Sequence, residues 1–227
     1  MTILCIETSG AECSVAVSVG ENVVFERVSE AGQSHAEKLG VFTEEALQAV
    51  PNGIDAVAVS GGPGSYTGLR IGVSLAKGLC FGLQTPLISI PTLYIIAAKT
   101  AAAVAVPDRR GALFCPMIDA RRKEVYAAVY DDTLNIVRAT EAVVLTDGTF
   151  NYGKPVYFSG SGTAKFKSIT TDENAVFPEG DFNPKAADMA IAAAKAFIDR
   201  RFEDTAYFEP FYLKDFIATK PKNKVFT

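Results

Sequence analysis

Short runs of apolar residues alternate with turn-forming residues along the first third of the chain. The first three runs have the length of strands, and the Gly, Asn and Ser residues between them are typical of tight antiparallel connections. Later segments carry apolar residues every three or four positions and therefore predict helices. The expected strands are residues 3–6, 13–19, 23–28, 54–60 and 87–90, and the expected helices are 36–50, a segment ending near 81, and 92–104.

The second half of the chain repeats this order of strands before helices, after a polar linker at residues 107–111. A longer helix is expected near the end, with Asn183 as its N-cap and Pro184 at its first position. The expected elements are strands at 113–118, 125–130, 136–144 and 156–159, a short helix after Gly160-Ser161-Gly162, and the helix at 184–201. The repeat predicts an α/β fold of two lobes with mixed sheets and packed helices. We place the lobes at residues 1–106 and 107–219, followed by a flexible basic tail at 220–227.

Composition narrows the classes of function. The formal net charge is −4, so binding to nucleic acid through global charge is disfavoured, although a local basic patch is compatible with it. The single histidine, His35, excludes sites built from several histidines, and we expect it to make a polar contact at a helix N-terminus. The four cysteines lie in apolar stretches and predict buried thiols. Without a secretory signal or an uninterrupted apolar span, the expected location is the cytoplasm, with no membrane contact.

Two loops contain the residue types that hold phosphate groups. One is Glu7-Thr8-Ser9-Gly10, for which an ordinary tight turn is the simpler interpretation. The other is the glycine-rich segment at residues 60–70, between a strand and a helix. It has neither the lysine of a Walker A loop nor the spacing of a dinucleotide-binding loop, and Pro63 removes one donor. This loop alone gives little support for phosphate binding.

The helix after the glycine-rich loop is apolar on nearly every side. It has one row of small residues at Gly68, Gly72 and Ala76, and a second row at positions 74, 78 and 82. One sheet cannot cover such a helix, so the preceding helix or another chain must do so, and we favour a partner. The predicted contact residues of that partner surface are Leu39, Phe42, Tyr66, Leu69, Arg70, Gly72, Val73, Ala76 and Lys77.

Three motifs carry a family resemblance that spans almost the whole chain. They are ILCIETS at residues 3–9, GGPGSYTGLRIG at 61–72 and IDARRKEVY at 118–126, and the Gly160-Ser161-Gly162 turn and PFYLK at 210–214 add to them. In these segments the chain resembles the TsaB (YeaZ) family. The resemblance implies the actin-like ATPase (sugar kinase/Hsp70/actin) fold with two ribonuclease-H-like lobes. It also implies vestigial nucleotide-site loops at Glu7, Thr8, Ser9, Gly61, Gly62, Asp119, Gly160 and Gly162, with Glu7 in place of the usual Asp.

The same resemblance implies a role in a complex. The expected function is that of a non-catalytic subunit that binds and stabilises a TsaD-like catalytic subunit, together with a TsaE-like ATPase. The complex transfers a threonylcarbamoyl group to N6 of the adenosine beside the tRNA anticodon. The isolated chain is expected to form a homodimer, to hold no cofactor or metal and to meet tRNA only through the complex, while ATP and a metal ion belong to the partner subunits.

Two alternatives of other classes remain open at this stage. One is a stand-alone ATP-binding enzyme of the actin-like fold. The other is a glycoprotease-like metallopeptidase, although TsaD-like chains bind their metal through two histidines and this chain has only one. The basic runs, among them Arg121-Arg122-Lys123, are most simply solvated surface, and a patch facing RNA is the alternative interpretation.

Overall fold

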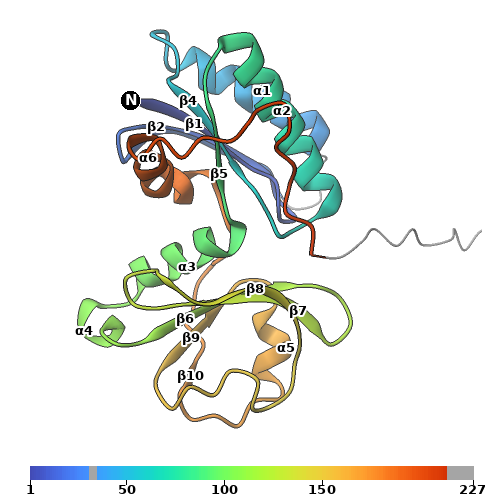
Figure 1. Ribbon diagram of the computed structural model, residues 1–227, viewed down its shortest axis with the longest axis vertical. Coiled ribbons are helices and arrows are strands. Elements are labelled where there is room, and N and C mark those ends of the chain that lie inside the picture. Colours follow the sequence, from blue (N-terminus) through green and yellow to red (C-terminus); the bar gives the residue numbers. More distant parts are fainter. Residues whose placement is uncertain (31–34, 214–227) are drawn as a thin grey trace, which may run out of the picture.

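Two five-stranded mixed sheets form the frame of the molecule within residues 1–30 and 35–213, which this computed structural model describes (Figure 1). The first sheet has the order β3-β2-β1-β4-β5, built from β1 (Thr2–Glu7), β2 (Ser14–Val19), β3 (Asn22–Val28), β4 (Ala56–Ser60) and β5 (Leu87–Ile90). The second has the order β10-β9-β6-β7-β8, built from β6 (Leu113–Asp119), β7 (Glu124–Tyr130), β8 (Ile136–Val144), β9 (Val156–Ser159) and β10 (Ala175–Val176). The predicted tail at 220–227 lies outside the described residues.

The two sheets have the same topology. In each, the first three strands form an antiparallel meander, and the first strand also pairs in parallel with the fourth, which pairs in parallel with the fifth. The prediction of a duplicated α/β lobe is therefore confirmed at the level of strand order and direction.

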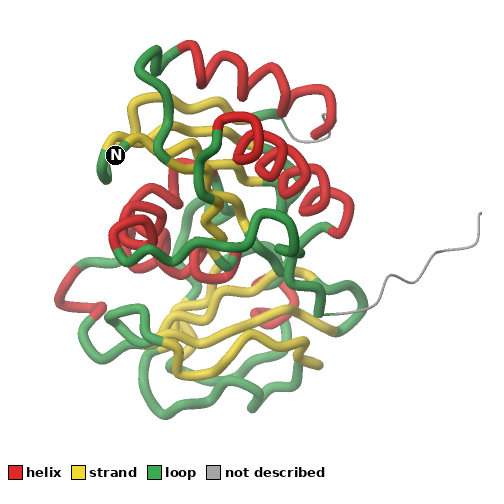
Figure 2. The backbone as a smooth tube through the Cα atoms, turned by 45° about the horizontal axis from the view of Figure 1, so that its top comes forward, coloured by secondary structure: helices red, strands yellow, loops and turns green. Residues whose placement is uncertain are grey.

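Helices cover both faces of the first sheet. The helix α1 (His35–Gln48) and the helix α2 (Tyr66–Leu83) lie side by side on one face, and the helix α6 (Ala190–Ile198), preceded by the 3₁₀ turn η1 (Ala186–Met189), covers the other (Figures 1 and 2). The remaining helices are α3 (Thr92–Ala103), α4 (Val106–Arg109) and α5 (Thr163–Lys167). None of the helices in the described ranges is long and apolar enough to cross a membrane.

Two helices pack on the sheet of the other half of the chain. The helix α3 follows the first sheet in sequence, yet Leu93 and Ala97 pack against Phe114 of the second sheet. Conversely, Met189 and Ala193 pack against Ile3 of the first sheet. The predicted division of the chain into lobes at residue 106 stays a prediction, but the packing of these two helices does not follow it.

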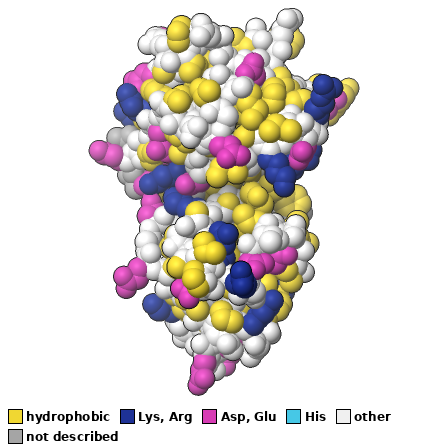
Figure 3. All heavy atoms as spheres, turned by 90° about the vertical axis from the view of Figure 1, so that its left-hand side faces the viewer, with side chains coloured by type: hydrophobic (Ala, Val, Ile, Leu, Met, Phe, Trp, Pro, Cys, Tyr) yellow, Lys and Arg dark blue, Asp and Glu magenta, His cyan; other side chains and the backbone are white. Residues whose placement is uncertain are grey.

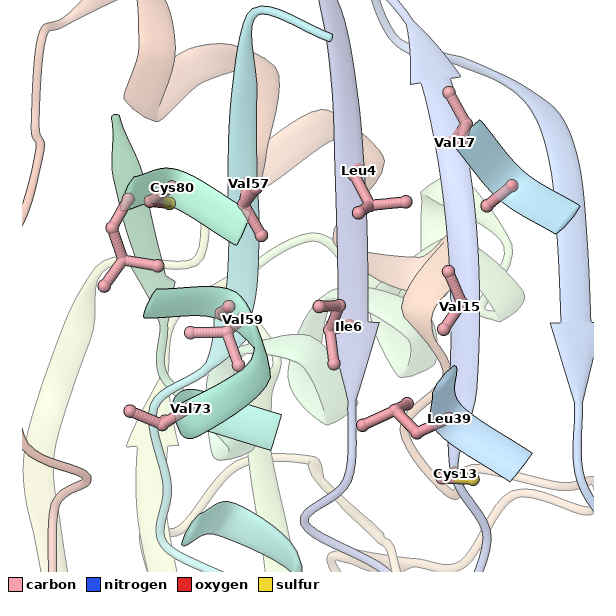
Figure 4. Close-up of a cluster of buried hydrophobic side chains, with 13 residues drawn as sticks. Leu4, Ile6, Cys13, Val15, Val17, Leu39, Val57, Val59, Val73 and Cys80 are labelled. Atoms are coloured by element: carbon pink, nitrogen blue, oxygen red, sulfur yellow. The ribbon is translucent and has the colours of Figure 1, made fainter. Parts of the chain in front are cut away.

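The central strand β1 is buried on both faces, which explains its continuous apolar sequence. Leu4 and Ile6 point toward α1 and α2, in the cluster shown in Figure 4. Ile3 and Cys5 belong to the cluster on the opposite face of the sheet. The predicted burial of all four cysteines as free thiols is confirmed.

The last predicted helix begins differently from the expectation. Asn183 is not its N-cap, because the chain first forms a 3₁₀ turn capped by Lys185. The backbone N–H of Lys185 donates to Asp188 Oδ2 at 2.9 Å, and this local bond fixes the start of the turn. Two elements of the structure are not among the predicted ones. They are α4, which overlaps the predicted linker, and the two-residue strand β10.

Candidate functional site

A groove of about 480 Å³ runs between α1 and α2 on the outside of the first sheet. Its lining is mainly apolar and small, with Tyr66 and Arg70 at one end: Ala36, Leu39, Gly40, Tyr66, Thr67, Arg70, Ile71, Ser74 and Leu75. The Arg70 guanidinium donates to Tyr66 Oη at 2.6 Å, and its Cζ lies 5.2 Å from the centre of the Tyr66 ring. The pair therefore forms a fixed aromatic and cationic edge to an open groove.

The two rows of small residues on α2 lie on different sides of the helix. A Cβ on Gly68 or Gly72 would overlap atoms of Thr8, so this row lies against the end of β1. A Cβ on Gly78 or Gly82 would meet nothing within 4 Å. The first row is thus an internal packing surface, and only the second row leaves space for another molecule.

This arrangement corrects part of the predicted partner surface. Leu69, Gly72, Val73 and Ala76 are buried in the chain's own core and offer no surface to a partner. The physical reason is that β1 and β4 already cover this side of α2, which leaves its other side exposed. Leu39 is also buried, at the floor of the groove, and half-buried Phe42 packs against the same core. Of the predicted contact residues, Tyr66 and Arg70 stand at the groove itself.

Lys77 has an internal role that the sequence did not suggest. Its ammonium group donates to the backbone carbonyls of Ala206 and Phe208, at 2.9 and 3.2 Å. Both belong to residues 203–213, the segment called here the C-terminal strap, which crosses α2 after the last helix (Figure 1). The strap also places Tyr212 against Tyr66, with ring centres 4.9 Å apart. The aromatic run near the end of the sequence is the one signal that could have indicated such packing.

The first predicted nucleotide-site loop is fully enclosed. Glu7, Thr8 and Ser9 are buried, and the Glu7 carboxylate accepts hydrogen bonds from the backbone and side chain of Ser9. Burial raises the pKa of Glu7 to about 7, although the bonds from Ser9 oppose this shift. A carboxyl group that is half-protonated near neutrality and already bonded on one side is a poor ligand for a hydrated cation.

The glycine-rich loop is filled by the chain itself. A Cβ on Gly62 would lie 2.8 Å from the carbonyl oxygen of Phe211, and a Cβ on Gly64 would lie 2.6 Å from atoms of Ser9. Gly61 is likewise held against Ser89, and its carbonyl accepts a hydrogen bond of 2.8 Å from Phe211 N. The glycines are needed because other backbone segments approach closely, and the strap lies directly against Gly61 and Gly62.

The third predicted loop lies in the second lobe. Lys165 Nζ donates to the Asp119 carboxylate at 2.6 Å, and the backbone N–H of Asp119 donates to Ser161 Oγ at 3.2 Å. Gly160 and Gly162 both lie against Met117, and a Cβ on Gly160 would be 2.5 Å from the Met117 carbonyl oxygen. The structure thus brings Asp119 together with the Gly160 turn, as the resemblance implies. Within residues 1–30 and 35–213, no hydrogen bond or ion pair joins these residues to Glu7, Thr8 or Ser9.

A second hollow of about 420 Å³ opens beside the Gly160 turn and is lined on its far side by residues 177–183. If a nucleotide bound in this hollow, its phosphates would extend toward the first lobe. There, Glu7 is enclosed and the glycine-rich loop is filled, so neither loop has free space for phosphate groups. The residues present therefore do not fit a bound ATP with its metal ion. In addition, no group of three or more His, Cys, Asp or Glu side chains within residues 1–30 and 35–213 is placed to hold a metal ion.

His35 makes the polar contact expected of it. It opens α1, and its Nε2 lies 3.2 Å from the carbonyl oxygen of Gly10, in the turn after β1. The ring therefore ties the start of α1 to the Glu7 loop.

Comparison of the sequence with known proteins identifies the family of this chain. The sequence matches the model of the family described as TsaD, tRNA N6-adenosine threonylcarbamoyltransferase, over residues 22–222. The chain belongs to this family. Its relatives include the tRNA threonylcarbamoyladenosine biosynthesis protein TsaB of Bacillus subtilis, 29% identical over 204 residues, which are 84% of this chain and 86% of that protein. The protein of the same name from Escherichia coli is 28% identical over 231 residues, 97% of each chain. Within the wider family, the chain is thus a TsaB (YeaZ) member, as the motifs predicted.

Solved structures agree on the fold. YeaZ from Pseudomonas aeruginosa superimposes with a TM-score of 0.79 at 23% identity, covering 93% of this chain and 99% of that one. A second structure from the same organism, described as similar to the peptidase YeaZ, gives a TM-score of 0.79 over 94% of this chain. Together with the duplicated sheet topology, this similarity confirms the predicted actin-like ATPase fold with two ribonuclease-H-like lobes.

Proposed function

We propose that this TsaB-family chain is a non-catalytic subunit in the biosynthesis of threonylcarbamoyladenosine in tRNA, and that it binds and stabilises a TsaD-like catalytic subunit. The relatives named above support the process, since both are threonylcarbamoyladenosine biosynthesis proteins. The observation that carries the subunit role is the open, apolar surface of α1 and α2 in a chain whose Glu7 loop and glycine-rich loop are closed by its own residues.

The partner surface consists of the groove and the free row of α2. Phe81 is 85% exposed near the end of α2, beside Gly78 and Gly82, which leave room for a partner's backbone. Ile71 and Leu75 line the groove between the two helices. This surface combines a large exposed aromatic ring, a groove and two glycines that leave room for a partner. A pair of helices can pack against such a surface.

Two helices from each chain would then meet across a two-fold or pseudo-two-fold axis. Because a TsaD-like subunit resembles this fold, it can offer the same pair of helices, and the homodimer and the TsaD-like complex compete for one surface. In this proposal the TsaE-like ATPase and the tRNA join through that complex, in the cytoplasm. ATP and the metal ion are held by the partner subunits.

The test is co-purification with a tagged TsaD-like subunit from the same cell, followed by sizing. Gly78→Arg places a large charge on the open row and should abolish both the homodimer and the complex, because the charge would be buried without a partner. Thermal melting should stay within a few degrees of the parent, because no residue in the described ranges lies within 4 Å of a Cβ at this position. Gly148→Arg is the matched control, in an exposed loop of the second lobe with the same free space.

Retained binding by a correctly folded Gly78→Arg chain would contradict the proposed surface. The absence of a complex between the parent chain and the TsaD-like subunit would contradict the subunit role. The isolated chain should show only background ATPase, peptidase and threonylcarbamoyl-transfer activity. Turnover that survives further purification and disappears in Glu7→Ala would instead favour a stand-alone enzyme.

A further inference from the structure

The turn between β6 and β7 presents three exposed basic side chains in succession, Arg121, Arg122 and Lys123. None of them forms an ion pair with any residue in the described part of the chain. Their positive charges are therefore available to another molecule.

The backbone of this turn favours other residues than arginine. Arg121 and Arg122 both have left-handed backbone conformations, with φ of 68° and 51°. Such a conformation is unfavourable for an ordinary L-residue, whereas Gly adopts it freely and Asn tolerates it. Two successive arginines in this conformation therefore add strain to the turn.

The base of the turn is rigid. Arg121 N donates to Asp119 Oδ1 at 2.6 Å, and Glu124 N donates to the carbonyl of Arg121 at 3.1 Å. Lys165 offsets the charge of Asp119 through their ion pair of 2.6 Å, so this nearby acid does not neutralise the arginines. The turn therefore holds two guanidinium groups and an ammonium group outward on a fixed support.

The turn lies at one side of the second lobe. In Figure 1 it lies on the right-hand side of the lower lobe, near α5 and on the same side of the molecule as the end of the strap. Figure 3 shows the face on the left of Figure 1, where acidic and basic side chains are interspersed over both lobes. The turn places three positive charges in succession on a chain of net charge −4.

We propose that Arg121, Arg122 and Lys123 bind the phosphate backbone of the tRNA when the chain is part of the complex. This inference rests on the proposed function. Guanidinium groups pair with phosphate oxygens through two parallel hydrogen bonds, and such contacts position an RNA without reading its sequence. Three contacts are too few for tight binding by an acidic chain alone, so the turn adds affinity and orientation to what the partner subunits supply.

The test uses the complex of this chain with its TsaD-like subunit and an unmodified tRNA transcript, measured by fluorescence anisotropy from 50 to 200 mM salt. The double variant R121N/R122N removes both charges and keeps a residue type that tolerates the left-handed conformation. The matched control is R200N/R201N, because Arg200 is also exposed and left-handed, with φ of 54°, and lies after α6. Sizing and thermal melting accompany every variant.

The expected result for R121N/R122N is a complex that forms and melts like the parent or at a higher temperature. It should bind tRNA about tenfold more weakly at physiological salt, with a salt slope lower by about 1.4–1.8, while the control matches the parent. If the complex forms normally and its affinity for tRNA and its salt slope are unchanged, the inference is wrong, but the proposed function is not contradicted. Loss of TsaD-like binding with unchanged tRNA affinity would also overturn the inference, by making the turn a protein-binding surface. A parent chain that forms no complex would overturn the proposed function and the inference with it.

Discussion

Gly72 of α2 packs against the side chain of Thr8 so closely that a Cβ at position 72 would overlap the Thr8 hydroxyl. The contact joins the N-terminal half of α2 to the end of β1 and fixes the helix on the sheet. It also shows that one row of small residues on α2 serves the chain's own packing, while the row with Gly78 is free.

Alanine substitutions should separate the two rows. Gly72→Ala forces Thr8 or the helix to move and should destabilise the chain by about 1–3 kcal/mol. Gly78→Ala adds a methyl group to an exposed helix position with free space and should stabilise it by up to about 1 kcal/mol. Urea unfolding followed by circular dichroism measures both. Equal effects of the same sign would show that the rows do not differ as described.

Glu7 should make stability depend on pH. Its folded pKa of about 7 lies above the ordinary 4.5, so the folded state holds the proton more tightly than the unfolded state. The resulting stabilisation is complete below pH 4.5 and is lost as the pH rises through 7, by about 3 kcal/mol at most. Glu7→Gln cannot titrate and should lack this loss. The check is the difference in free energy of unfolding between variant and parent at pH 5 and pH 8, and a flat difference would contradict it.

Lys77 should hold the C-terminal strap in place. Lys77→Met keeps the apolar stem and removes the bonds to Ala206 and Phe208, at a cost of about 1 kcal/mol for this partly exposed group. Faster hydrogen exchange at the amide of Phe211, which bonds to Gly61, should report the loosened strap. Lys195→Met on the exposed face of α6 serves as the control. Unchanged exchange at Phe211 would mean that Lys77 does not anchor the strap.

The four cysteines should be unreactive in the folded chain. All are buried free thiols, and burial raises the pKa of Cys5 to about 12 and of Cys80 to about 11, which suppresses the reactive thiolate. A thiol reagent such as DTNB should therefore detect none in buffer and four in concentrated urea. Rapid reaction in buffer would indicate that part of the core opens readily.

Much of this molecule could be predicted from local pattern. Strand β1 has a continuous apolar sequence because both its faces are covered, and the strands of the first meander are separated by residues that form turns. The motifs also brought the Glu7 loop, the glycine-rich loop and the Asp119 turn together as one set. The strands depend on residue type and spacing along the chain, which a sequence displays directly, whereas the set of three loops came from the family resemblance.

The sequence by itself determined the two repeated lobes, the burial of the cysteines and an α2 too apolar for one sheet to cover. Only the tertiary structure decided that Gly72 faces Thr8 while Gly78 faces open space, that α3 and α6 pack on the other half's sheet, and that the strap fills the glycine-rich loop. The physical reason is that an apolar side chain indicates a position that must avoid water, and a small residue indicates a position that allows close approach. The identity of the approaching atoms, such as Phe211 against Gly62, depends on contacts between segments far apart in sequence.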